Sequence, residues 1–420
     1  MKRETAFFGA VLMCAGLGMA QYNAPTSAAE TNALAEIRTQ RGGGLIALQP
    51  WAQLMGERRL GVGWMTSVEA DGVVEWTQEE GADAAWRTAW HAEDGLRQAG
   101  GTRQRAVVEG YDPAKPLRFR AKSRHMTSFK PYKVTFGEEA VSAERVLRPL
   151  ARADGGVSFA VFNDIHSRTH LYPLLLPQAG EGLDFAVFNG DVLQDPQTEA
   201  DLAEHLLLPM AWFTSKGLPC FFLRGNHETR GAFARQMKDY LLLPERKYYG
   251  AMTFGAARVV LLDCGEDKPD TSVEYSGLVD FEPYMEAQLA WLEREVAGEA
   301  FRAATWRVVV VHIPPSWAKE EAKLWHGERR LRERFAPVFD RGGVHVVISG
   351  HTHKPEVIAP CPDEGRGFRW PVFIGGAHPL EKATVIRVDA TPERLRVARY
   401  HADGSVGAEQ VWNAAAGGTP

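Results

Sequence analysis

The sequence has few cysteines for its length, with four in 420 residues. Cys14 lies in an apolar N-terminal run that we expect to be removed, so the mature chain keeps Cys220, Cys264 and Cys361. Three thiols permit at most one disulfide, which excludes a fold that depends on a disulfide framework. Cys220 and Cys264 lie in or beside apolar runs, so we expect buried thiols without a chemical role.

The chain also lacks an excess of charge of either sign. It has 48 lysines and arginines against 53 aspartates and glutamates, and a formal net charge of −5. Proteins that bind nucleic acid usually concentrate positive charge on one face, so the composition argues against nucleic acid as the main partner. A small anionic substrate needs only a local positive site, which metal ions could supply.

No apolar run is long enough to span a bilayer comfortably. The longest N-terminal one, residues 5–20, follows a short positive start at Lys2 and Arg3 and ends in small residues. This pattern is typical of a cleavable export signal over residues 1–20, so we expect a periplasmic or secreted protein with no transmembrane segment after processing. A buried N-terminal helix and lipid attachment at Cys14 are the alternatives, and the bulky Met13 disfavours attachment.

The length fits two domains after the signal. Residues 21–44 are polar, end in three glycines and are expected to be a linker. Residues 45–150 contain short runs that alternate apolar and polar residues between turn signals, which predicts a small all-β sandwich. The runs are residues 45–51, 60–64, 73–76, 105–108, 117–121 and 132–136.

The sequence pattern changes at about residue 155. The new pattern predicts an α/β domain over residues 155–402, followed by a C-terminal tail at 403–420. Strand-length apolar runs alternate here with amphipathic helical patterns, and strands that are apolar throughout are covered on both faces. The apolar runs are residues 157–162, 185–188, 219–223, 259–262, 308–311 and 344–348. The helical patterns are residues 199–214, 231–242, 283–296 and 328–339.

Polar residues of the kinds that bind metal ions follow five of these apolar runs. In open α/β sheets, ligands bind in the crevice beyond the carboxyl ends of the strands, so we expect these side chains to meet at one edge. Two carboxylates, one amide and four imidazoles suit two ions that share a bridging carboxylate and keep positions open for water and substrate. The candidate ligands are Asp164, His166, Asp191, Asn226, His312, His351 and His353.

Each of these pieces alone has an ordinary structural explanation. Asp191 after Gly190 is typical of a turn, Asn226 could cap a helix, and His312 could be a hydrogen-bonded core histidine. Their order along the chain and their common position at strand ends together favour a metal site.

The motifs, taken in order, resemble those of the calcineurin-like metallophosphoesterase superfamily over roughly residues 155–400. They read Asp164-Ile165-His166, Gly190-Asp191, Gly225-Asn226-His227-Glu228, His312 after an apolar run, and Gly350-His351-Thr352-His353. The resemblance implies a four-layer α/β/β/α sandwich with two mixed sheets between helices. It also implies a phosphoesterase that hydrolyses phosphate monoesters or diesters by attack of a metal-bound hydroxide at a pair of divalent or trivalent ions: manganese, iron, zinc or a mixture.

The resemblance also assigns roles to single residues. It places one ion on Asp164, His166 and His353, the other on Asn226, His312 and His351, and makes Asp191 the bridge. His227 is then the catalytic histidine that binds no metal. Arg224 occupies the position of an arginine in the serine/threonine protein phosphatases, where its planar guanidinium would suit a phosphoryl group; a salt bridge to a nearby carboxylate is an equal alternative.

The β-rich first domain resembles the fibronectin-type-III-like domain that precedes the catalytic domain of purple acid phosphatases, notably at Gln49-Pro50-Trp51 and residues 61–66. Two positions differ from that branch. His166 stands where those enzymes have glycine, and Gln194 stands where they have an iron-binding tyrosine. The resemblance therefore implies a related but distinct phosphoesterase without the purple colour or the ferric preference that the tyrosine supports.

The substrate is expected to be a small phosphorylated molecule, and neither the oligomeric state nor the choice between monoester and diester follows from the sequence. Residues 277–284 and 318–327 are candidate pocket walls. His170, Tyr172 and His378 lie near the motifs and are interpreted as structural loop residues, with pocket lining as the alternative. An exported binding or scaffold protein with a vestigial metal site is the competing hypothesis.

Overall fold

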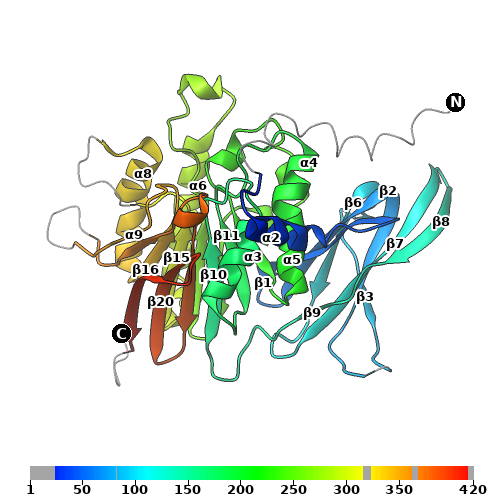
Figure 1. Cartoon of the computed structure of the whole chain (residues 1–420), viewed down its shortest axis with the longest axis horizontal. Coiled ribbons are helices and arrows are strands. Elements are labelled where there is room, and N and C mark those ends of the chain that lie inside the picture. Colours follow the sequence, from blue (N-terminus) through cyan, green and yellow to red (C-terminus); the bar gives the residue numbers. More distant parts are fainter. Residues whose placement is uncertain (1–23, 82, 316–322, 362–367, 415–420) are drawn as a thin grey trace.

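The computed structural model describes residues 24–81, 83–315, 323–361 and 368–414 (Figure 1). The predicted export signal at residues 1–20, with Cys14, lies outside the described residues. Within the described ranges, no helix has both the length and the apolar character needed to cross a membrane.

Two β-sheets form the centre of the molecule. In the larger sheet β10 (Val157–Phe162), β11 (Phe185–Asn189) and β12 (Cys220–Leu223) are parallel, and β19 (Thr384–Ala390), β20 (Arg394–His401) and β21 (Val406–Asn413) extend it antiparallel. The second sheet has the order β13-β14-β15-β16-β18-β17. Its strands are β13 (Gly250–Phe254), β14 (Ala257–Leu262), β15 (Trp306–Val311), β16 (Val346–Ser349), β17 (Glu356–Ile358) and β18 (Val372–Ile374). All six apolar runs predicted as strands in this domain are therefore confirmed.

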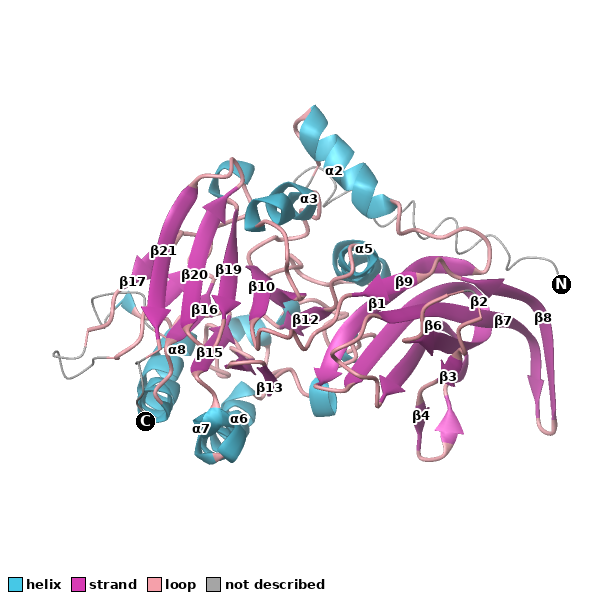
Figure 2. Ribbon diagram, turned by 90° about the horizontal axis from the view of Figure 1, so that it is seen from below, coloured by secondary structure: helices cyan, strands magenta, loops and turns pink. Residues whose placement is uncertain are grey.

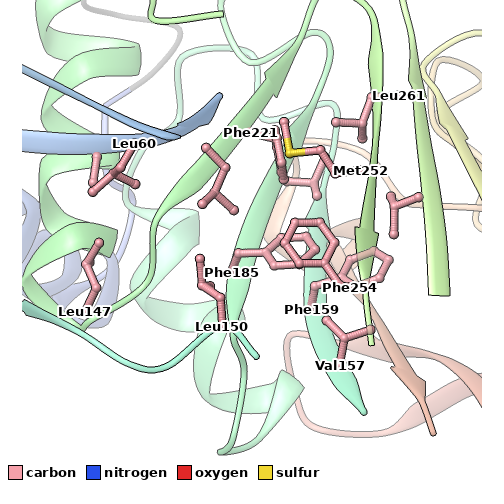
Figure 3. Packing of buried hydrophobic residues seen from close by; sticks show 14 of the residues in the cluster. Leu60, Leu147, Leu150, Val157, Phe159, Phe185, Phe221, Met252, Phe254 and Leu261 are labelled. Atoms are coloured by element: carbon pink, nitrogen blue, oxygen red, sulfur yellow. The ribbon is translucent and has the colours of Figure 1, made fainter. Parts of the chain in front are cut away.

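The two sheets pack face to face through an aromatic core. Phe159, Phe185, Phe221 and Phe254 lie between them (Figure 3), and the rings of Phe159 and Phe185 stack with centroids 4.8 Å apart. The outer faces are covered by α3 (Leu171–Leu175) and α5 (Leu208–Ser215) on one side and by α6 (Phe281–Ala297), α7 (Glu299–Ala303) and α9 (Ala336–Gly342) on the other (Figures 1 and 2). This arrangement is the predicted four-layer α/β/β/α sandwich.

The β-rich N-terminal region continues the larger sheet. Its main strands are β1 (Ile46–Gly56), β2 (Arg59–Thr77), β6 (Ala99–Glu109), β7 (Leu117–Lys130) and β8 (Lys133–Val141). The long strand β2 pairs with β1 and β6 along its first half and with β7 along its second half. On the other side β1 pairs in parallel with β12, where Gln53 faces Cys220. The two predicted domains therefore share one sheet, and their exact boundaries stay a prediction.

Two segments expected to lack regular structure contain elements. The linker at 21–44 includes helix α2 (Ala28–Arg38), which begins with a capping box between Ser27 and Glu30 and buries Ile37 in the core. The tail at 403–420 contributes β21, which pairs along β20. Both corrections have the same cause, because packing against neighbouring elements stabilises segments whose own pattern is weak.

The helical predictions need three corrections. Residues 231–242 form turns and a short 3₁₀ helix (Met237–Asp239), because the backbone there bonds to Pro196 and to Gln53 of β1. The helices at 199–214 and 328–339 each contain a π-turn, at Ala203–Leu207 and Leu331–Phe335. Pro209 and Pro337 follow these turns, and each lacks the N–H that would continue the α-helical ladder.

Candidate metal centre

The loops that follow β10, β11 and β12 of the larger sheet meet those that follow β15 and β16 of the second sheet. All seven predicted ligands lie on these loops, and all but His353 are buried. Two groups of their side chains have ligand atoms within 4.8 Å of one another, one with Asp164, His166, Asp191 and His353, the other with Asp191, His312 and His351. Asp191 belongs to both groups, as a bridging carboxylate would.

The first group converges on a small space. Nε2 of His166 lies 3.0 Å from Nε2 of His353, which is itself 3.4 Å from Oδ1 of Asp164. The Asp164 carboxylate is held in place by the backbone N–H of His351 and by the Asn163 amide, which donates to its Oδ2 at 2.6 Å. Nitrogen and oxygen donors at such mutual distances fit the ligand spacing around one ion.

Buried donor atoms that need a partner lie in the second group and in the loop after β12. Among the described residues, Oδ1 of Asn226 and Nε2 of His351 are buried without a hydrogen bond. Nδ1 of His312 lies 2.8 Å from the Asn189 carbonyl, and its Nε2 lies 3.1 Å from Oδ2 of Asp191. Since Nδ1–H donates to the carbonyl, Nε2 faces a carboxylate, and either a proton or a metal cation between the two removes the repulsion. These residues therefore fit a second metal ion.

The protonation of these groups agrees with a cation site. Burial lowers the pKa of His351 to about 4, which keeps its ring in the neutral form that binds metals. Burial alone would lower the pKa of His312 as well, but the Asp191 and Asp164 carboxylates raise it to about 10. Although burial favours the protonated acid, His312 holds the pKa of Asp191 well below its usual range.

Glycines precede several ligands because there is no space for a side chain. A Cβ added at Gly190 would lie 2.5 Å from the His312 ring, and one added at Gly350 would lie 2.4 Å from Oδ2 of Asp164. The Gly-Asp and Gly-His motifs of the sequence thus allow the loops of the two sheets to approach each other closely.

Five of the seven ligand residues adopt a left-handed backbone that non-glycine residues rarely take. They are Asp164, His166, Asp191, His351 and His353, with φ between 46° and 69°. Such conformations cost about 1–3 kcal/mol each and cluster at functional sites. The surrounding hydrogen bonds hold this strained backbone and orient the donor atoms within the two groups.

Glu228 organises the backbone of the centre, a role that the sequence did not reveal. Its buried carboxylate accepts hydrogen bonds from the backbone N–H groups of Gly225, Asp191 and Leu193 at 2.8–2.9 Å. It therefore ties the loop after β12 to the loop after β11. The only sequence signal was its place in the Gly-Asn-His-Glu motif.

Gln194 positions the first group through His166. Its side-chain Oε1 lies 2.9 Å from Nδ1 of His166, so this ring nitrogen donates and Nε2 is left to face His353. The two positions that differ from purple acid phosphatases, His166 and Gln194, are thus in direct contact with each other.

His227 lies beside the ligands without belonging to either group. Its backbone N–H donates to Oδ1 of Asp191 at 3.0 Å, and its Nδ1 lies 2.5 Å from the Gln194 carbonyl and 3.4 Å from Oδ1 of Asp195. Burial opposes the charged form, but Asp195 and Asp191 raise the pKa of His227 to about 9. The ring can therefore donate a proton from Nε2 while its Nδ1 is held.

Arg224 does not extend a free guanidinium toward the ligands. It forms a buried salt bridge to Asp263, with Nη2 at 2.6 Å from Oδ2, and lies over the Tyr248 ring at 4.4 Å. Asp263 also accepts a hydrogen bond from the Tyr284 hydroxyl. The guanidinium thus makes a salt bridge of the kind given as the alternative, and the phosphoryl-binding role of Arg224 stays a prediction.

The three further residues near the motifs have different surroundings. Tyr172 is buried among Phe162, Phe188 and Phe213, and His170 is buried 3.9 Å from the Glu30 carboxylate, so both are structural. His378 instead lies against the His166 ring, with centroids 4.7 Å apart, and a nitrogen of its ring is within ligand distance of His166 and His353.

Comparison with known proteins agrees with this geometry. The family model for calcineurin-like phosphoesterases matches residues 157–355. Purple acid phosphatase PPD1 from yellow lupin (Lupinus luteus) seeds has a similar structure, with a TM-score of 0.64 at 13% sequence identity, covering 86% of this chain and 73% of that one. No curated protein sequence matches the chain.

Two further solved structures match with TM-scores too low to support an argument. They are a conserved uncharacterized protein from Streptococcus pneumoniae described as a predicted phosphoesterase (TM-score 0.27, 13% identity, 61% of this chain and 98% of that one) and a single mutant of Vps29 from Entamoeba histolytica (TM-score 0.28, 13% identity, 61% and 99%).

Proposed function

Residues 157–355 form a calcineurin-like phosphoesterase domain, and from this premise we propose that the chain hydrolyses phosphate monoesters or diesters at a centre of two metal ions. The observation that carries the proposal is the pair of donor groups that share Asp191. Buried donor atoms without partners among the described residues, at Asn226 and His351, support it further. The substrate class expected is a small phosphorylated molecule.

Each ligand residue has a defined task in this proposal. Asp164, His166 and His353 would hold one ion, Asn226, His312 and His351 the other, and Asp191 would bridge the two. When bound, the ions would acidify a water molecule and offset the negative charge of the phosphoryl group. Manganese, iron(II), zinc or a mixture suits this nitrogen and oxygen donor set, which contains no tyrosinate or thiolate.

His227 is the proposed proton donor to the leaving oxygen. Its Nδ1 is fixed by the Gln194 carbonyl and Asp195, which leaves Nε2, 4.0 Å from Oδ2 of Asp191, on the side of the ligands. A donor held in this way protonates the ester oxygen as its bond to phosphorus breaks.

Hydrolysis after metal loading is the direct test. Protein reconstituted with manganese, iron(II) or zinc should cleave p-nitrophenyl phosphate or bis(p-nitrophenyl) phosphate, and Asp191→Ala should abolish this activity. Since Asp191 is buried, His353→Ala at the half-exposed ligand should be measured as well, with His401→Ala as the control outside the centre. Activity that persists in both ligand variants would show that the centre does not perform the reaction.

The competing hypothesis is an exported scaffold protein with a vestigial metal site. The complete set of seven ligands in one place disfavours it, because a decayed site is expected to lose donors. A protein that binds no metal in titration calorimetry with manganese or zinc would favour the scaffold.

We further propose export to the periplasm or outside the cell, with removal of residues 1–20, and a fibronectin-type-III-like origin for the N-terminal β-region. N-terminal sequencing of protein purified from its native host tests the first of these. A mature chain that begins at or near Gln21 is the expected result.

A further inference from the structure

A large exposed aromatic side chain lies against the proposed metal centre. Trp325 is 41% exposed, and its ring centroid is 4.6 Å from that of His351, with the two ring planes nearly perpendicular. His351 in turn contacts the His312 ring, with centroids 5.4 Å apart. The indole therefore packs directly against a residue that would hold one of the ions.

The backbone holds Trp325 at this place. The residue is the N-cap of α8 (His326–Arg330), and its carbonyl accepts the N–H of Arg329 at 2.9 Å. Two residues later the N–H of Gly327 donates to the Asp267 carbonyl, and a Cβ on Gly327 would lie 2.5 Å from the Glu266 carbonyl oxygen. The start of α8 is therefore packed closely against the loop after β14, which limits the movement of the indole.

Glu266 holds the loop after β14 in place through its hydrogen bonds. Its carboxylate is fully buried and accepts hydrogen bonds from the Arg230 guanidinium and, at 2.6 Å, from the Tyr275 hydroxyl. Arg230 also forms an ion pair with Asp267 at 3.0 Å. Trp325 is thus a partly exposed aromatic side chain at the start of a helix that packs on this loop, and it contacts a ligand residue of the centre.

We propose that Trp325 is a specificity residue that stacks on a ring in the alcohol part of the substrate, so that the preferred substrates are phosphoesters of aryl alcohols or nucleosides. The inference rests on the proposed phosphoesterase function. A phosphoester whose phosphoryl group binds at the centre would have its alcohol part beside the exposed indole that contacts His351. Stacking buries both apolar faces and needs no charge, in keeping with an uncharged indole.

A kinetic comparison of two substrates tests the proposal. The value of kcat/KM for phenyl phosphate should fall about tenfold in Trp325→Ala, while that for glycerol 2-phosphate stays within about twofold, and Trp325→Phe should restore most of the loss. Each substrate is compared with itself between variants, so the different leaving groups cancel. Trp90→Ala is the matched control, because Trp90 is 46% exposed on the β-region.

The alternative is a purely structural role, in which Trp325 only packs against His351 and orients it. In that case Trp325→Ala lowers kcat/KM for both substrates equally, and that result would overturn the proposal. A wild-type protein that hydrolyses neither substrate contradicts the proposed function instead of this inference.

A binding measurement tests the proposal even if the protein hydrolyses neither substrate. Titration calorimetry of the metal-loaded protein should show that phenylphosphonate binds more tightly than methylphosphonate, and that Trp325→Ala removes this difference. Equal binding of the two phosphonates by the wild-type protein would show that Trp325 does not recognise a ring.

Discussion

At the scale of single residues, the centre depends on positions where any added atom collides with a ligand. Gly350 is the sharpest example, since its missing side chain leaves space for the Asp164 carboxylate. Residues of this kind bind nothing themselves, but they decide whether two loops can meet.

Gly350→Ala should therefore weaken metal binding at least tenfold while the fold is kept. The added methyl group would lie 2.4 Å from Oδ2 of Asp164, so the carboxylate must turn away from His353. Metal content after dialysis against a fixed concentration of manganese measures the effect, and circular dichroism checks the fold. Gly43→Ala is the control, because a Cβ there would meet no described atom within 4 Å. Unchanged metal content in Gly350→Ala would contradict the prediction.

Gln194 gives a second prediction at this scale. Gln194→Leu should lower the affinity for one of two metal equivalents about 10- to 100-fold, because His166 loses the acceptor that fixes its ring. Gln194→Glu keeps an acceptor and should retain tight binding of both equivalents. Titration calorimetry separates the two steps, and a Leu variant that matches the wild-type isotherm would disprove the positioning role.

The sequence revealed the ligands but not the residues that hold them. Asp164, Asp191 and His312 follow apolar runs directly, which is a local signal. Glu228 and Gln194 act through contacts between loops that are far apart in the chain, and the salt bridge between Arg224 and Asp263 is of the same kind. No spacing in the sequence records such contacts.

At the scale of elements, the start of β11 carries a buried acid. Asp184 accepts the N–H of Ser158 on β10 at 2.7 Å, and its carboxyl is almost fully buried. Burial raises the pKa of Asp184 to about 6, against the opposing effects of the Ser158 hydrogen bond and Arg152. The junction of β10 and β11 therefore favours the protonated acid.

The raised pKa predicts a pH-dependent effect of Asp184→Asn. Between the unfolded pKa near 4 and the folded value of about 6, the unfolded chain releases the proton and the folded chain keeps it, so wild-type stability falls as pH rises. The variant should match the wild type near pH 4 and exceed it by about 1–3 kcal/mol at pH 7–8. Urea unfolding at several pH values measures this, with Asp83→Asn at an exposed site of the β-region as the control. A difference that does not change with pH would contradict the assignment.

Strands were easier to predict than helices in this chain. Runs such as 157–162 and 308–311 are almost entirely apolar because helices and a second sheet cover both faces, and this burial is visible locally. The helix expected at 231–242 fails because its backbone bonds to Pro196 and Gln53, which are distant in the sequence. The π-turns before Pro209 and Pro337 were not predicted, because the spacing of apolar residues indicates a helix without distinguishing α-helical from π-helical turns.

At the scale of the whole molecule, the β-region and the phosphoesterase domain are structurally joined. Ile46, Ala52 and Leu54 of β1 belong to the same apolar core as Phe185 and Phe221. The backbone N–H of Ala52 also donates to the Thr214 hydroxyl of α5. Pairing between β1 and β12 leaves no local signature, so the sequence could only predict two separate domains.

A fragment that begins at residue 151 should therefore be unstable by itself. It would expose the edge of β12 and part of the shared core, and we expect a thermal midpoint at least 10 °C below that of the longer chain beginning at residue 24, or aggregation. Differential scanning calorimetry of both chains provides the measurement. Equal midpoints would show that the sheet extension contributes little to stability.

The parallel pairing of β1 with β12 also fixes an order of events during synthesis. Gln53 leaves the ribosome long before Cys220, its neighbour in the sheet. Until β12 has emerged, β1 presents an open edge, the kind of surface that recruits strands from other chains. The edge of β1 is therefore covered only once β12 is present, and the larger sheet is complete only after β19, β20 and β21 near the C-terminus have been added.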